Sequence, residues 1–76
     1  MTGRLPTLTA RQVMRALERA GFVLARSRGS HHKFVFPGRP ERFAIVPNHP
    51  GDLKRPVVRS IIKQAGMTES EFAAFL

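Results

Sequence analysis

The sequence contains no cysteine, no tryptophan and no tyrosine, and only five of its 76 residues are acidic. Without cysteine the chain can form neither a disulfide nor a thiolate metal site, and it has no cysteine nucleophile. Its fold must therefore rest on side-chain packing alone. The three histidines, His31, His32 and His49, are too unevenly spaced to predict a zinc site. We therefore expect no bound metal and no cofactor.

Long apolar runs are missing as well. No segment approaches the ~20 apolar residues of a membrane span, and the N-terminus lacks the apolar core of a secretory signal. We expect a cytoplasmic protein without a membrane partner. A chain of 76 residues with 42% apolar and 24% charged residues predicts one globular domain with a single small core.

Positive charge is what the sequence has in excess. Thirteen Lys and Arg residues against five Asp and Glu residues leave a net charge of +8. Such a charge predicts an anionic partner, with nucleic acid first, an acidic protein second and a membrane surface third. Ten of the thirteen cations are Arg, whose planar fork suits phosphate. The alternative to an anionic partner is that the positive charge only keeps the chain soluble.

The first half of the chain predicts a short arm and then a helix. Residues 1–7 lack a periodic pattern, and we expect a flexible N-terminal arm followed by one domain over residues 8–76. Thr9 and Gln12 have the spacing of a capping box at the start of a helix over Leu8–Gly21. The buried stripe of this helix follows the i, i+3, i+4, i+7 pattern at Val13, Ala16, Leu17 and Ala20.

Three strands are expected next, at Phe22–Ser27, His31–Phe36 and Glu41–Pro47. Arg28-Gly29-Ser30 and residues 37–40 form the turns between them, so the strands should pair as an antiparallel meander. For the third strand the core candidates are Phe43, Ile45 and Val46.

A second helix follows the loop at residues 48–52, with Pro56 suited to its first position. Its apolar stripe is Val58, Ile61, Ile62 and Ala65, and Gly66 ends it. Thr68 and Glu71 form another capping box before a short C-terminal helix. The predicted fold is α+β, helix–three strands–helix, with two helices on one face of the sheet and the other face open.

The histidine doublet lies where the second strand begins. Side chains alternate along a strand, so His32 should share the side of Phe34, and His31 should share the open face with Lys33. His31 is therefore the better candidate for chemistry, and His32 is expected to be half-buried with ring nitrogens bonded to backbone. A β-bulge at Gly29–Ser30 would exchange the two histidines, so His32 is the alternate.

A histidine beside cations suits cleavage of RNA. The 2′-OH is the nucleophile, and an imidazole, which in general titrates near pH ~6.5, can remove or donate a proton. Cations stabilise the charged phosphorus centre, and with so few carboxylates a magnesium pair is not expected. His49 could share the proton transfers with His31 or be an ordinary loop residue. The candidate RNA-binding residues are Arg26, Arg28, Gly29, Ser30, Lys33 and His49.

With these residues in hand, the chain resembles the HicA toxin family of YcfA-like mRNA interferases. The matching segments are Ala20–Val23, Gly29–His32, Val46–His49 and Arg59–Gly66. The resemblance implies a fold similar to a double-stranded-RNA-binding domain and a metal-independent endoribonuclease that cleaves mRNA as a toxin. It also implies a HicB-like antitoxin that covers the active site. The family histidine falls on His31, or on His32 in members that place it one residue later.

Two other functions fit the same residues. A non-catalytic RNA-binding module needs only the charge and the open sheet face, and it predicts salt-sensitive binding without cleavage. A module that binds an acidic protein would bind its partner without affinity for RNA at physiological salt.

Overall fold

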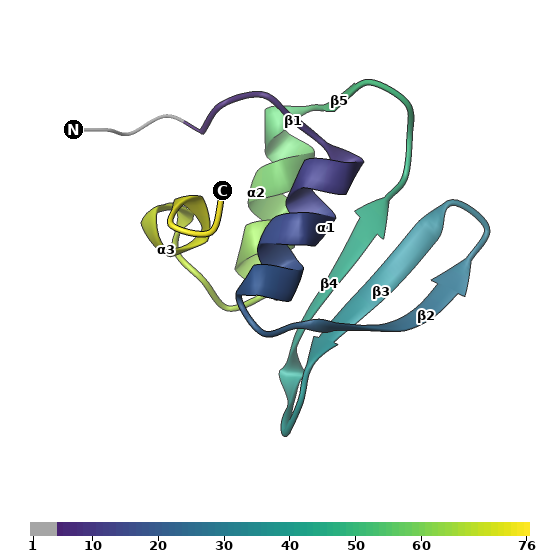
Figure 1. Cartoon of the computed structure of the whole chain (residues 1–76), viewed down its shortest axis with the longest axis vertical. Helices are drawn as coiled ribbons and strands as arrows, with labels where there is room; N and C mark the ends of the chain where they lie inside the picture. The colour runs from purple at the N-terminus through teal and green to yellow at the C-terminus, as the bar shows by residue number, and fades with distance from the viewer. Residues whose placement is uncertain (1–4) are drawn as a thin grey trace.

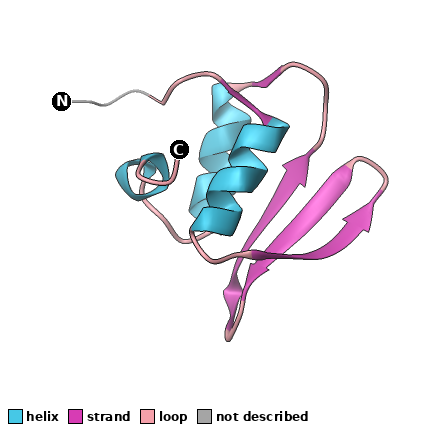
Figure 2. Cartoon of the chain, in the orientation of Figure 1, coloured by secondary structure: helices cyan, strands magenta, loops and turns pink. Residues whose placement is uncertain are grey.

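The computed structural model describes residues 5–76, and over these residues it has the predicted α+β layout. One antiparallel sheet has the strand order β2-β3-β4, and a short second sheet pairs β1 with β5. Figure 1 shows α1 and α2 next to each other, beside the main sheet, and Figure 2 shows the same view by secondary structure. In chain order the elements are β1 (Leu8–Thr9), α1 (Ala10–Arg19), β2 (Val23–Arg28), β3 (His31–Phe36), β4 (Arg39–Pro47), β5 (Asp52–Leu53), α2 (Arg55–Gln64) and α3 (Glu69–Ala73).

Helix α1 begins at the predicted capping box. The Gln12 backbone N–H donates to the Thr9 hydroxyl at 3.2 Å, and the Thr9 backbone N–H donates to Gln12 Oε1 at 2.8 Å. Val13 and Leu17 are completely buried, which confirms the predicted stripe. The helix starts at Ala10 rather than Leu8 because an N-cap residue has extended backbone, and Leu8 and Thr9 form β1.

The sheet buries one face against the helices through Phe34, Ala44 and Val46. Two predicted core residues of β4 were wrong, since Phe43 is only half-buried and Ile45 is 40% exposed. Ile45 pairs with Lys33 and Val46 pairs with His32. Neighbouring residues of a strand point to opposite faces, so Ile45 and Val46 cannot both reach the core.

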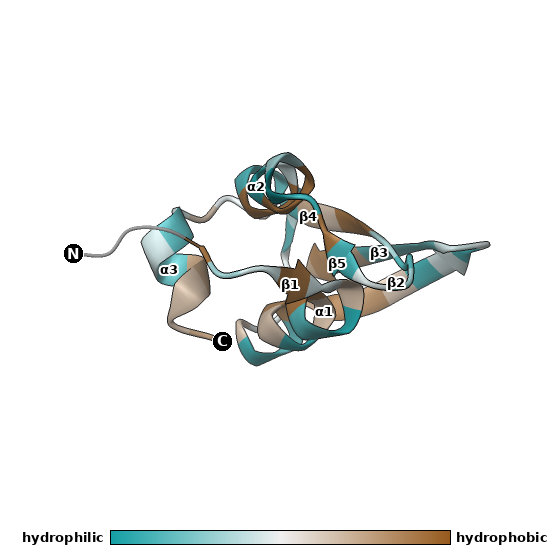
Figure 3. Ribbon diagram, turned by 90° about the horizontal axis from the view of Figure 1, so that it is seen from above, coloured by the Kyte–Doolittle hydropathy of each residue, from teal (hydrophilic) through white to brown (hydrophobic). Residues whose placement is uncertain are grey.

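Helix α2 buries Val58, Ile61 and Ile62 as predicted. It begins at Arg55, so Pro56 lies one position later than expected. In Figure 3 the apolar side of α2 is turned toward β4. At the edge of β4, the Ile45 backbone N–H donates to Gln64 Oε1 at 3.1 Å. A side chain of α2 thereby satisfies a backbone donor of a strand that has no neighbour on that side.

Other features of the fold were not predicted from the sequence. β4 begins at Arg39 instead of Glu41, and the loop after it contains β5, where Leu53 pairs with Leu8. Within the predicted arm, residues 1–4 lie outside the described residues, whereas Leu5 is buried and its carbonyl accepts from Arg55 Nε at 3.1 Å.

Helix α3 has the predicted capping box. The Thr68 backbone N–H donates to Glu71 Oε1 at 2.8 Å, and the Glu71 backbone N–H donates to the Thr68 hydroxyl at 3.0 Å. The helix also delivers the completely buried ring of Phe72 to the core. A five-residue helix thus contributes one of the largest core side chains.

Candidate nucleic-acid interface

The β2–β3 hairpin projects from the helices and carries the histidine doublet at its end (Figure 1). Arg28 pairs with His31, which leaves Gly29 and Ser30 as a two-residue loop. Gly29 has φ +59°, as a tight hairpin turn requires at its first central position. This turn fixes Arg28 directly across from His31.

A β-bulge at Ala25 decides which way the β2 cations point. Leu24 pairs with Phe34, but Arg26 pairs with Lys33, and the register shifts between them. In a regular strand Arg26 would point to the same inward face as Leu24. The extra residue turns Arg26 to the opposite, open face. The cations of β2 therefore lie on the open face. The bulge lies before the turn and not at Gly29–Ser30, so it does not exchange His31 and His32.

On the open face, one shallow hollow of about 220 Å³ gathers the cations around His31. It is lined by Arg26, Arg28, His31, Lys33 and Ile45. We call this set the cationic hollow. His31 is exposed there, so the placement expected from strand alternation is confirmed. Lys33 Nζ lies 5.5 Å from the centre of the Phe43 ring, which supports the ammonium beside the hollow.

His32 lies on the opposite face of the strand and is half-buried, as predicted. Its Nδ1 is 2.8 Å from the Ser27 hydroxyl, directly across the strand pair. The partner of Nδ1 is therefore a side-chain hydroxyl and not the expected backbone group. His32 borders a hollow of about 470 Å³ against α1, which it shares with Arg11, Arg15 and Asn48 among others.

Ser30 and His49 lie near each other in the chain path, at the hairpin turn and in the loop after β4. The Asn48 backbone N–H donates to the Ser30 carbonyl at 2.6 Å, which ties the end of β4 to the hairpin turn. His49 follows as an exposed loop residue. Among the described residues no hydrogen bond links His49 to His31. The proposed division of acid and base roles between them stays a prediction.

A second hollow, of about 380 Å³, also borders His31, and the sequence did not predict it. It is lined by His31, Ile45, Pro47, Pro56, Val57, Ser60, Ile61 and Gln64. We call it the apolar hollow. The sequence contained little indication of this hollow, because Ile45 was expected to lie in the core. Only the structure shows that β4 turns this side chain toward α2.

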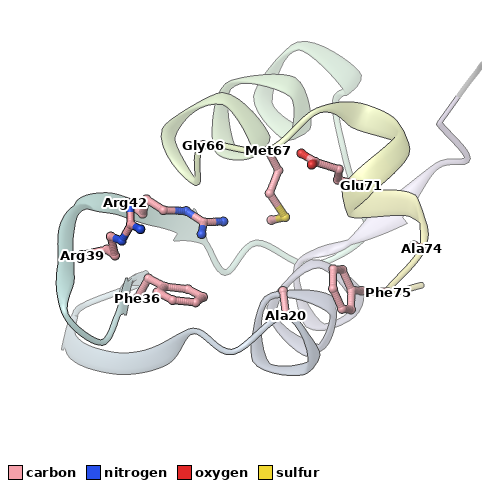
Figure 4. A pocket seen from close by; sticks show the side chains of 9 residues that line it. All are labelled: Ala20, Phe36, Arg39, Arg42, Gly66, Met67, Glu71, Ala74 and Phe75. Atoms are coloured by element: carbon pink, nitrogen blue, oxygen red, sulfur yellow. The ribbon is translucent and has the colours of Figure 1, made fainter.

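Another hollow, of about 610 Å³, lies at the far end of the sheet, between the end of the β3–β4 hairpin and α3 (Figure 4). Arg42 borders it, with its guanidinium 4.5 Å from the Phe36 ring centre and its Nε donating to the Ala65 carbonyl at 2.9 Å. Its lining contains no histidine. The predicted site and this hollow are therefore separate places.

Residues 5–76 contain no group of three His, Cys, Asp or Glu side chains arranged to hold a metal ion. None of the helices in this part of the chain has the length and apolar content needed to cross a membrane.

The fold and the hairpin define a class, a small α+β protein whose open sheet face carries a histidine among arginines and a lysine. The sequence model of the family described as HicA toxin of bacterial toxin–antitoxin matches residues 10–67. Because this match covers most of the 76 residues, the chain belongs to the HicA toxin family. It is accordingly assigned to the toxins of toxin–antitoxin systems. A search of curated proteins found no match.

Proposed function

We propose that this protein is a metal-independent endoribonuclease that cleaves mRNA in the cytoplasm, with His31 as its catalytic residue. The observation that carries the proposal is the position of His31, exposed on the open face and surrounded by Arg26, Arg28 and Lys33. Family membership supports the toxin role. The net charge of +8 supports a polyanionic substrate.

The chemistry needs proton transfer and charge stabilisation. The neutral imidazole of His31 takes the proton of a ribose 2′-OH, and O2′ attacks the adjacent phosphorus. The bond from phosphorus to O5′ breaks, and O5′ takes up a proton from an acid or from water. The products are a 2′,3′-cyclic phosphate and a 5′-OH. Arg26, Arg28 and Lys33 stabilise the additional negative charge on the phosphorus centre, so the scheme has no step that needs a metal ion.

The remaining candidates act in binding. Gly29 and Ser30 form the turn that the RNA backbone contacts, and the space beside Gly29 is open, since a Cβ there would meet nothing within 4 Å. His49 contacts RNA beyond the end of β4. A HicB-like antitoxin inhibits the toxin by covering the cationic hollow. An acidic surface on that partner would match the same three cations.

Purified protein tests the activity directly. Incubated with RNA in EDTA, it should cleave as fast as without chelator and leave 2′,3′-cyclic phosphate ends. A matched RNA with 2′-O-methyl groups should stay intact, because its nucleophile is blocked. Cleavage of the methylated RNA, or loss of cleavage in EDTA, contradicts the proposal.

The second candidate is a non-catalytic RNA-binding module. The observation that favours it is that every residue of β2 is exposed and so available to bind RNA. Charge on an open sheet face is enough for binding that weakens with salt. The same assay separates the two functions, since a binding module retains RNA on a filter and leaves it uncut.

A further inference from the structure

The apolar hollow beside His31 has walls suited to a flat, partly apolar ligand. Ile45 is 40% exposed and Val57 is 36% exposed, although both are large apolar residues. Pro47 and Pro56 extend the same wall. Its volume of about 380 Å³ falls in the range, roughly 300–1,000 Å³, that is typical of small-ligand clefts.

Polar groups lie at one side of these walls. Residues 56, 57, 60, 61 and 64 form one stripe of α2, so Ser60 and Gln64 follow each other by one turn. Gln64 Oε1 accepts from the Ile45 backbone N–H at 3.1 Å. This bond fixes the amide plane and leaves Nε2 as a donor group for a ligand. Ser60 adds a hydroxyl that can donate or accept.

The two hollows that border His31 adjoin each other. His31 and Ile45 line both of them. One hollow supplies three cations, and the other supplies apolar walls with a donor and a hydroxyl. A nucleotide has the same division, with a charged phosphate at one end and a flat base with hydrogen-bonding edges at the other.

We propose that the apolar hollow is a nucleobase subsite. The base next to the cleaved phosphate packs against Ile45 and Val57, and its edge bonds to Gln64 Nε2 and the Ser60 hydroxyl. Because Nε2 only donates, the subsite favours a base that presents an acceptor there. The subsite makes cleavage dependent on the base. This inference rests on the proposed ribonuclease function and adds the residues that select the substrate.

The first test needs no cleavage. In an NMR titration of the full chain, the four nucleoside 3′-monophosphates should shift the Gln64 side-chain amide and the backbone amides of Val57 and Ser60. Ribose 5-phosphate, which has no base, should shift only signals of the cationic hollow. If nucleotides and ribose phosphate give the same shifts, the base subsite is overturned. It is also overturned if only an acidic protein partner moves the α2 signals.

The second test maps cut positions on an RNA of mixed sequence. Gln64→Met has nearly the same size and no donor, so it should reduce the preference among bases by roughly two- to tenfold, the usual effect of one hydrogen bond. Val57→Ser makes the wall of the hollow less apolar and should also reduce the preference among bases. Val23→Ser is the matched control, because Val23 is 49% exposed on β2 and borders neither hollow.

The outcomes separate the two claims. Unchanged preference in both Gln64→Met and Val57→Ser, with cleavage intact, overturns the subsite and leaves the ribonuclease standing. Base-dependent shifts without any cleavage by the wild-type chain support the subsite and contradict the ribonuclease. A thermal melt of each variant shows whether the fold is kept.

Discussion

At the scale of single residues, the site depends on one unpaired position in β2. The bulge at Ala25 turns Arg26 and Arg28 to the face that carries His31 and Lys33. Four groups that carry or can carry positive charge thereby share one side of a two-stranded ribbon. Such clustering costs stability through repulsion unless an anion is bound. A polyanion is the ligand that relieves it.

Gly29 holds this arrangement together through its backbone. Its φ of +59° lies in the left-handed region, where a Cβ costs about 1–2 kcal/mol. Gly29→Ala should therefore lower the free energy of unfolding by about that amount in a urea titration. Gly29→Asn should lose less, since Asn tolerates this conformation. Equal stability of Gly29→Ala and the wild type would mean that the turn adopts another conformation.

The sequence predicted much of this site at residue level. Strand alternation was sufficient to place His31 outside and His32 inside, because a half-buried sheet has a period of two. It did not reveal the bulge, since nothing about Ala25 distinguishes it from its neighbours. The apolar hollow was missed for a different reason. Ile45 resembles a core residue in any single strand, and only the position of α2 shows otherwise.

At the scale of elements, the capping boxes of α1 and α3 were the most predictable features. Both capping boxes, Thr9 with Gln12 and Thr68 with Glu71, form as the spacing predicted. Such motifs are local, so three or four residues determine them. The β1–β5 pair was not predictable in the same way, because two-residue strands carry no periodic pattern and their pairing joins residues far apart in sequence.

The first capping box offers a direct test of this local control. Thr9→Ala removes the hydroxyl that accepts from the Gln12 backbone N–H, and it should cost about 1 kcal/mol of stability. Thr9→Ser keeps the hydroxyl and should remain within a few tenths of a kcal/mol of the wild type. Chemical denaturation of the three proteins gives the comparison. Losses of the same size in both variants would assign the effect to the Thr9 methyl group.

At the scale of the whole molecule, a small core is shared among elements from both ends of the chain. Leu5 precedes the family match and Phe72 follows it, yet both are buried. A domain of this size has little apolar area to spare. The buried residues outside residues 10–67 therefore belong to the folding unit that presents the hairpin.

Phe72 tests this conclusion. Phe72→Ala should destabilise the protein by about 3–5 kcal/mol, because it empties a completely buried position. That loss is a large part of the 5–15 kcal/mol that holds a typical domain. Phe75→Ala, at a half-buried position of the same segment, should cost clearly less. Similar urea midpoints for the two variants would show that the C-terminal segment is not part of the core.

The same small domain exposes His31 and half-buries His32, and the central proposal is that His31 is the catalytic residue. The most direct measurement is RNA cleavage in EDTA by His31→Ala and His32→Ala, each checked for folding by its melting temperature. The account predicts that His31→Ala loses cleavage by a factor of at least about 100, the usual contribution of a general acid or base. His32→Ala should keep most of its activity. A fully active His31→Ala, or an inactive but folded His32→Ala, would contradict the account.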